Sequence, residues 1–166
     1  MNSGCFKKEF KDFLISIQVV DFKGLVRSIP ANKISFNYRS IELPKDLIFL
    51  SATFKGKVKN SDEINNYMTE LNTMKNMAQP SKIKTSGSTF KNPINQTDKK
   101  VWELIRSSVL NEVSYGDAAI SQKHANFFVN KKNAKSADMK SLISFVKKKV
   151  KDQTGIKLEL EIVVVE

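Results

Sequence analysis

The spacing between apolar residues changes along the chain from two residues to three or four. Of all the features of the sequence, this change limits the possible folds most. From residue 13 to residue 19 the apolar side chains take the odd positions, with Ser16 and Gln18 between them, which is the period of a half-buried strand. Residues 21–24 have the composition of a turn, and residues 25–29 and 48–54 have the pattern of further strands. The first third of the chain is therefore predicted to be β-rich.

Three later segments repeat their apolar residues at helical spacing. The first covers residues 61–77, the second follows Thr97, and the third follows Ser136. Strand patterns at residues 127–129 and 157–165 flank the third helix, and the polar residues 81–96 favour a loop. The predicted fold class is α+β. The apolar helix positions are Ile64, Met68, Leu71 and Met74; Val101, Leu104, Ile105 and Val109; and Met139, Leu142, Ile143, Val146 and Val150.

The composition indicates a soluble, globular chain of 166 residues, since its hydrophobic residues, 40% of the total, form no run long enough to span a bilayer. Residues 1–11 lack the apolar core of a secretory signal, so a cytoplasmic location is expected. Cys5 is the only cysteine and His124 the only histidine, which excludes an internal disulfide and a zinc-ligand set. Redox chemistry would therefore need an organic cofactor.

The formal net charge of +11 favours an anionic partner. Only Arg27, Arg39 and Arg106 are arginines, whereas proteins that read base sequence rely on arginine. The scarcity of arginine argues against nucleic acid as the partner, and a solvated lysine-rich surface is the main alternative.

Several short strings in the chain occur together in one family. The central one is Gly87-Ser88-Thr89-Phe90-Lys91-Asn92-Pro93, in the polar loop. In their order and approximate spacing these strings resemble the UDP-N-acetylenolpyruvoylglucosamine reductases (MurB), and the resemblance covers nearly the whole chain. The others are Met1-Asn2-Ser3-Gly4, Phe36-Asn37-Tyr38-Arg39-Ser40, Gly116 with Ala118 and Ser121, His124-Ala125-Asn126-Phe127 with Asn130, and Gly155-Ile156-Lys157-Leu158-Glu159-Leu160-Glu161-Ile162.

The resemblance implies a flavoenzyme of peptidoglycan precursor synthesis. In this family NADPH reduces FAD, and the flavin gives a hydride to the enolpyruvyl double bond of UDP-N-acetylglucosamine enolpyruvate. By resemblance, Ser88 is the general acid that protonates the neighbouring carbon, while Arg39 and Glu161 stabilise the enolate-like charge. Periodicity gives Glu161 separate support, because the apolar positions 158, 160, 162 and 164 leave it on the opposite face of the predicted strand.

The resemblance also implies binding residues and three parts of the chain. Residues 1–58 would be the end of an FAD-binding (PCMH-type) domain, residues 59–80 a connecting helix, and residues 81–166 the substrate-binding domain. The implied substrate-binding residues are Tyr38, Lys91, Asn92, His124 and Asn126, and the implied cofactor-binding residues are Asn2 and Gly4.

The chain departs from the family pattern where glycines are expected. Its six glycines are isolated, so no Gly-rich loop can bring backbone amides against a pyrophosphate. A family glycine falls at Lys7, a Gly-Gly pair becomes Gly116-Asp117, and a small and basic string becomes residues 108–112. Because the family's flavin loops would lie upstream of Met1, the chain alone is expected not to hold FAD or to act as a reductase. A separate N-terminal flavin-binding part is an expected partner.

Two other functions stay open at this stage. One is a catalytically silent module that binds a UDP-sugar without flavin. The other is a lysine-rich nucleic-acid-binding domain. The sequence also leaves open whether such a chain is a fragment, one product of a split gene or a remnant.

Overall fold

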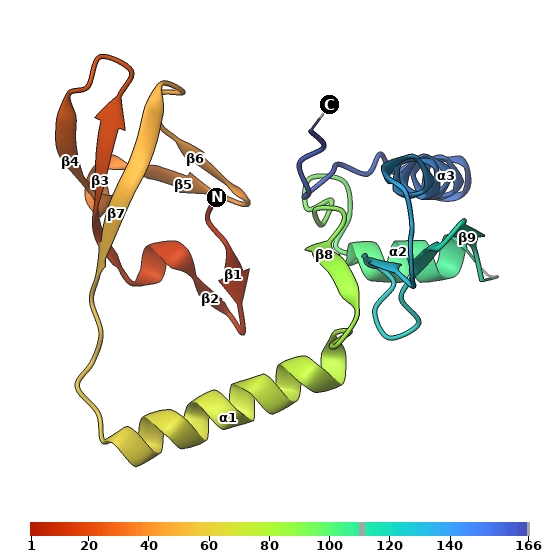
Figure 1. Ribbon diagram of the computed structural model, residues 1–166, viewed down its shortest axis with the longest axis horizontal. Coiled ribbons are helices and arrows are strands. Elements are labelled where there is room, and N and C mark those ends of the chain that lie inside the picture. The colour runs from red at the N-terminus through yellow and green to blue at the C-terminus, as the bar shows by residue number, and fades with distance from the viewer. Residues whose placement is uncertain (110–111, 166) are drawn as a thin grey trace. The chain divides into compact units, whose positions relative to one another are not determined.

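The computed structural model describes residues 1–109 and 112–165 and divides the chain into two compact units, Met1–Asn60 and Ser61–Glu166 (Figure 1). The first unit is mostly strands, and the second combines three helices with a small sheet. The predicted α+β class is confirmed. None of the helices in the described ranges is both long and apolar enough to cross a membrane.

The first unit is built around a three-stranded antiparallel sheet in the order β4-β3-β7. Its strands are β3 (Leu14–Asp21), β4 (Val26–Pro30) and β7 (Leu47–Phe54), and a tight turn with a hydrogen bond from the Gly24 N–H to the Asp21 carbonyl joins the first two. Two short hairpins complete the unit (Figure 1). They are β1 (Gly4–Cys5) with β2 (Lys8–Glu9), and β5 (Ser35–Asn37) with β6 (Ser40–Glu42); the 3-10 turns η1 (Phe10–Asp12) and η2 (Ala31–Lys33) lie between elements.

In strand β3 the buried residues differ from those predicted, which were the odd positions 13 to 19. Ile17 and Val19 are buried as expected, but Leu14 is buried in place of Phe13 and Ile15, which are about half exposed. The pairing with β7 contains a bulge, because Leu14 pairs with Phe54 and Ser16 with Thr53, so Ile15 has no partner. An extra residue reverses the alternation of side chains, which is why the odd-position pattern fails at the start of the strand.

The second unit contains α1 (Ser61–Ala78) and the antiparallel sheet β8-β11-β10-β9 with α2 and α3. The strands are β8 (Lys84–Ser88), β9 (Ser114–Tyr115), β10 (Ala118–Ile120) and β11 (Phe127–Asn130), and the helices are α2 (Val101–Ser108) and α3 (Ser136–Thr154). Helix α3 contacts α2 as well as β9 and β10. Gly155 ends α3 with a positive φ of 74°, which glycine adopts without strain.

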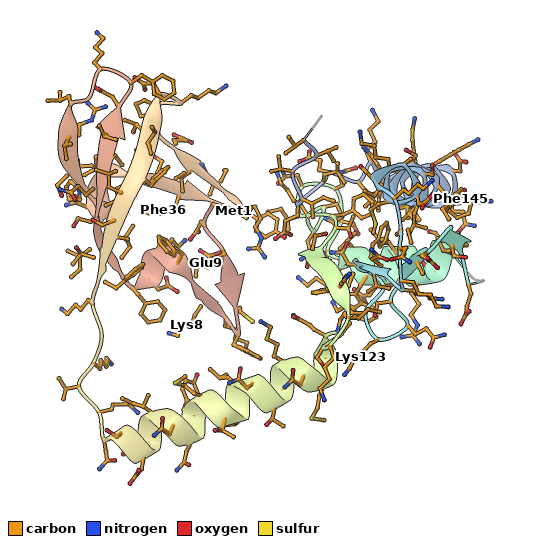
Figure 2. All side chains as sticks on the ribbon, in the orientation of Figure 1. Met1, Lys8, Glu9, Phe36, Lys123 and Phe145 are labelled. Atoms are coloured by element: carbon orange, nitrogen blue, oxygen red, sulfur yellow. The ribbon has the colours of Figure 1, made fainter. Side chains whose placement is uncertain are left out.

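One hydrophobic core joins α2, α3 and the sheet, and the crowding of side chains between these elements is visible in Figure 2. The Phe90 and Phe128 rings meet edge to face at 5.7 Å between centroids. Helix α1, by contrast, has no buried residue, although its apolar residues follow the predicted spacing. The core residues are Phe90, Val101, Leu104, Ile105, Ala118, Phe128, Leu142, Ile143, Val146, Val150 and Leu158.

The last segment corrects a second prediction. Residues 157–165 were expected to form a strand, but the described part of this segment makes only an isolated bridge between Leu160 and Phe90, a residue that follows the end of β8. Leu158 is buried and Leu160 and Ile162 are partly buried, whereas Val163, Val164 and Val165 are exposed. The alternation of apolar residues therefore corresponds to burial only near the bridge. Among the described residues, the later valines have no neighbouring segment to pair with.

Candidate functional site

A buried asparagine holds the backbone of the segment that contains Ser88. The Asn126 side chain accepts a hydrogen bond from the Phe90 N–H at 3.0 Å and donates one to the Phe90 carbonyl at 2.8 Å. The Asn126 carbonyl accepts a third from the Thr89 N–H at 2.8 Å. Asn126 is only 3% exposed, so water cannot readily replace these bonds. Residues 87–91, which we call the Ser88 segment, are thus fixed from one side.

The end of the chain fixes the same segment from the other side. The Lys91 N–H donates to the Glu159 carbonyl and the Glu161 N–H donates to the Thr89 carbonyl, both at 2.9 Å. These bonds flank the Phe90–Leu160 bridge, so the backbone of Glu161 lies beside Thr89 and one residue from Ser88. The structure therefore brings together two predicted catalytic residues that are 73 positions apart in the sequence, 161 minus 88.

Local turns set where the Ser88 segment begins and ends. Gly87 has a φ of 85°, and its N–H donates to the Thr85 hydroxyl, which itself donates to the Phe128 carbonyl. At the other end, Asn92 accepts a hydrogen bond from the Val101 N–H at 3.0 Å and so ties the segment to the first turn of α2. Positive φ is the reason that glycine suits position 87.

Lys91 and His124, both predicted to contact substrate, differ in how exposed their polar groups are. The Lys91 ammonium lies 3.8 Å from the Glu159 carboxylate in a pair open to solvent, which contributes little to stability. The His124 Nδ1 accepts a hydrogen bond from the Asn126 N–H, and burial lowers the pKa of the imidazole. The lowered pKa favours the neutral imidazole, in which acceptance at Nδ1 leaves the proton on Nε2.

Tyr38 and Arg39 lie in the first unit, in the turn between β5 and β6. Arg39 has a positive φ of 57°, and its guanidinium stacks over the Tyr38 ring at 5.0 Å from the centroid. A cation over an aromatic face keeps its charge while its orientation is restricted. The convergence of Arg39 with Ser88 and Glu161 stays a prediction.

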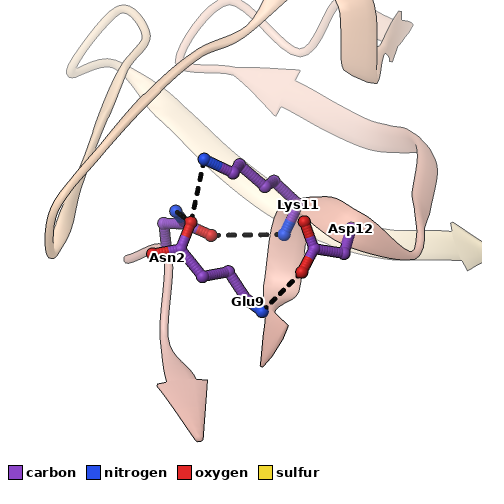
Figure 3. Close-up of polar contacts among 4 residues, drawn as sticks. All are labelled: Asn2, Glu9, Lys11 and Asp12. Carbon is purple, nitrogen blue, oxygen red and sulfur yellow. Dashed lines mark hydrogen bonds and ion pairs between the residues drawn. The ribbon is translucent and has the colours of Figure 1, made fainter. Parts of the chain in front are cut away.

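The two predicted cofactor residues, Asn2 and Gly4, have structural roles in the N-terminal hairpin, and Figure 3 shows the contacts of Asn2. The Asn2 side chain is 1% exposed; it donates to the Glu9 carboxylate at 2.9 Å and accepts from the Lys11 N–H at 3.2 Å. Gly4 lies so close to β2 that an added Cβ would be 2.9 Å from the Lys8 carbonyl oxygen. Hydrogen bonds from Lys11 and Asn2 hold the pKa of the Glu9 carboxyl below its usual value.

The described residues do not fit a complete flavin site. The polar atoms of Asn2 are used within the hairpin, and the glycines are isolated, so no run of free backbone amides faces a pyrophosphate. Lys7, where the resemblance leads us to expect glycine, has a φ of 61°, a conformation that favours glycine. The departure predicted at residues 108–112 includes positions 110 and 111, which lie outside the described residues.

Comparison with known proteins decides the family. The profile of the UDP-N-acetylenolpyruvoylglucosamine reductase C-terminal domain matches residues 79–165. The chain belongs to the UDP-N-acetylenolpyruvoylglucosamine reductase family. A curated reductase of this name from Pelagibacter ubique (strain HTCC1062) is 62% identical over 162 residues, which cover 98% of this chain and 54% of the relative.

Other members of the reductase family agree. A reductase from Rickettsia bellii (strain RML369-C) is 43% identical over 98% of this chain and 53% of its own length. The crystal structure of the reductase (MurB) from Thermus caldophilus superposes with a TM-score of 0.79 at 31% identity, covering 97% of this chain and 56% of that one. The chain thus spans about half the length of these reductases.

A substitution at Asn126 tests whether its hydrogen bonds hold the backbone of the Ser88 segment in place. Asn126→Ala removes both side-chain bonds to Phe90 and leaves a buried N–H without a partner, so we expect the free energy of unfolding to fall by about 1–3 kcal/mol. Hydrogen exchange at the Phe90 amide should become faster, and mass spectrometry or NMR would measure it. Asn133→Ala is the matched control, because that side chain is exposed. If hydrogen exchange at the Phe90 amide were unchanged in Asn126→Ala, the Asn126 side chain would not be needed to hold the Ser88 segment.

Proposed function

We propose that this chain supplies the substrate-side part of a UDP-N-acetylenolpyruvoylglucosamine reductase, which reduces UDP-N-acetylglucosamine enolpyruvate to UDP-N-acetylmuramate in peptidoglycan synthesis. The observation that carries the proposal is the pairing of the Ser88 segment with residues 159–161. It places a hydroxyl and a carboxyl on adjacent backbone segments, as one small enolpyruvyl group would require.

The role proposed for Ser88 is delivery of a proton. Hydride addition to one carbon of the double bond leaves negative charge that spreads from the other carbon into the substrate carboxylate. Ser88 then gives its hydroxyl proton to that carbon and regains a proton from water or from a nearby ammonium such as that of Lys91. Because an alcohol is a weak acid, its position must be fixed before the reaction, and the bonds around residues 89–91 do this.

Arg39 and Glu161 are proposed to stabilise the charge that forms. A guanidinium offers a permanent positive charge to the carboxylate, and a protonated Glu161 would donate a hydrogen bond to the same group. Asn126 is proposed to act through the Ser88 segment, since its side-chain oxygen and nitrogen both bond to Phe90. Lys91, Asn92, His124 and Tyr38 remain proposed substrate contacts.

The resemblance implies FAD, reduced by NADPH, as the source of the hydride. Since the described residues do not form a complete flavin site, this chain's own part is to hold the enolpyruvyl group and to supply the proton. A separate flavin-binding part is the proposed partner, and the cytoplasmic location predicted from the sequence stays a prediction.

A UDP-sugar-binding module without catalysis is the second candidate, and the incomplete flavin site favours it. The two functions share one binding segment and differ only in whether turnover follows. Binding and turnover therefore have to be measured separately.

Titration of the isotopically labelled chain with UDP-N-acetylglucosamine enolpyruvate, followed by NMR, tests where the substrate binds. Backbone amides of residues 88–91 and 159–161 should shift, because they surround Ser88 and Glu161. UDP-N-acetylglucosamine, which lacks the enolpyruvyl group, should shift these amides less. If saturating substrate moves only amides away from both stretches, the proposed site is wrong.

A further inference from the structure

The terminal segment, residues 157–161, is held in place by few backbone contacts. Within the part of the chain that the structure describes, its backbone bonds to another backbone only through the two hydrogen bonds that flank the Phe90–Leu160 bridge. The side chains still alternate, because Leu158 is buried between two exposed neighbours. A slip of one residue would exchange the two faces, so the placement of Glu161 depends on the register of this segment.

Pro93 prevents the backbone pairing from continuing beyond the bridge. Counting three positions from the bridge along each segment brings Pro93 opposite Lys157. At this position both residues of an antiparallel pair would donate an N–H, and proline has none. The Pro93 carbonyl is also occupied, because it accepts hydrogen bonds from the Gln96 and Thr97 N–H groups at 2.9 and 3.1 Å. The backbone opposite Lys157 therefore cannot fix the register there.

The Gln96 side chain makes the two bonds that Pro93 cannot make. Its Oε1 accepts a hydrogen bond from the Lys157 N–H, and its Nε2 donates one to the Lys157 carbonyl, both at 3.0 Å. One planar amide thus satisfies both backbone groups of Lys157, as a paired residue on a neighbouring strand would. In an extended segment the next residue directs its N–H and C=O to the opposite edge. A slip of one residue would therefore break both bonds.

We infer that Gln96 is a positioning residue of the reductase: it fixes the register of residues 157–161 and so holds Glu161 beside the Ser88 segment. The inference rests on the function proposed for Glu161. Gln96 is exposed, and hydrogen bonds that compete with water add little to the stability of the whole unit. Misplacing a reacting group by about 1 Å, in contrast, can slow a reaction about a hundredfold. A change at Gln96 should therefore affect the reaction rate far more than stability.

Hydrogen exchange in the isotopically labelled chain tests whether Gln96 fixes the register. Gln96→Leu should speed exchange about tenfold at the Glu161 amide, which bonds to the Thr89 carbonyl and not to Gln96. Gln153→Leu, the same substitution at an exposed position of α3, is the matched control and should leave this amide unchanged. Gln96→Glu should resemble Gln96→Leu at pH 7, because a carboxylate cannot donate, and should match the unchanged chain below about pH 4, where the protonated carboxyl can donate.

A double-mutant cycle in a complete reductase that contains this chain tests the effect on the reaction. Gln96→Leu should slow reoxidation of the flavin by the substrate about tenfold to a hundredfold and leave reduction by NADPH unchanged. In a Glu161→Ala background the same substitution should have little further effect, because Gln96 acts through Glu161.

Two results would overturn the role of Gln96 and leave that of Glu161 intact. One is unchanged reoxidation in Gln96→Leu while Glu161→Ala is slow, and the other is equal slowing by Gln96→Leu with and without Glu161. If Glu161→Ala were reoxidised at the unchanged rate, the function proposed for Glu161 would be wrong, and the inference would be wrong with it.

Discussion

Replacing Ser88 by alanine in a complete reductase that contains this chain is expected to slow product formation about a hundredfold to ten-thousandfold. The change removes the proposed proton donor but no side chain that packs in the core, because Ser88 is only partly buried at the end of β8. Oxidation of NADPH in the first half-reaction should keep its rate, since it needs no proton from Ser88. Rapid-mixing absorbance would follow reduction and reoxidation of the flavin separately.

Ser86→Ala is the control for this prediction. Ser86 lies on the same strand two residues earlier, and its side chain is exposed. Each variant loses one serine hydroxyl from β8. If Ser88 has a specific role, only Ser88→Ala should slow reoxidation of the flavin by the substrate. Equal reoxidation rates in Ser88→Ala and the unchanged enzyme would rule out Ser88 as the proton donor.

The second large effect concerns stability. Leu142 in α3 is completely buried in the core of the second unit, and Leu142→Ala is expected to lower the free energy of unfolding by about 2–5 kcal/mol. Alanine keeps the helix, so the loss comes from apolar contacts and the cavity. Urea unfolding of the chain, followed through Trp102 fluorescence, would measure this because Trp102 is in the same unit.

An exposed aliphatic residue in the same unit provides the comparison. Ile94 is 53% exposed, so Ile94→Ala should change the free energy of unfolding by no more than about 0.5 kcal/mol. If Leu142→Ala were as mild as Ile94→Ala, the core described around α3 would be wrong.

Helical periodicity predicted α2 and α3 well because each of these two helices buries one face. Leu104, Ile105 and Leu142 were expected on apolar faces and are in the core. Periodicity alone could not show that the face of α1 is exposed, since the same spacing is found whether or not a helix has a partner. The β3 bulge and the shortness of the pairing at residue 160 also depend on neighbouring segments, which a local pattern does not report.

The candidate site was predictable in part. The strings around Ser88 and Glu161 pointed to both residues, and the structure places their backbones on paired segments. The sequence did not predict that the Asn126 side chain holds the backbone at Phe90, because these hydrogen bonds join residues 36 positions apart.

The central claim is that this chain provides a working substrate-side part of the reductase. The most direct measurement joins it to the part of the Pelagibacter ubique reductase that it does not match and records NADPH oxidation with and without UDP-N-acetylglucosamine enolpyruvate. We predict oxidation that depends on the enolpyruvyl substrate and is lost in Ser88→Ala, with none from this chain alone. A chimera that binds FAD and is reduced by NADPH, yet is not reoxidised by the substrate, would contradict the account.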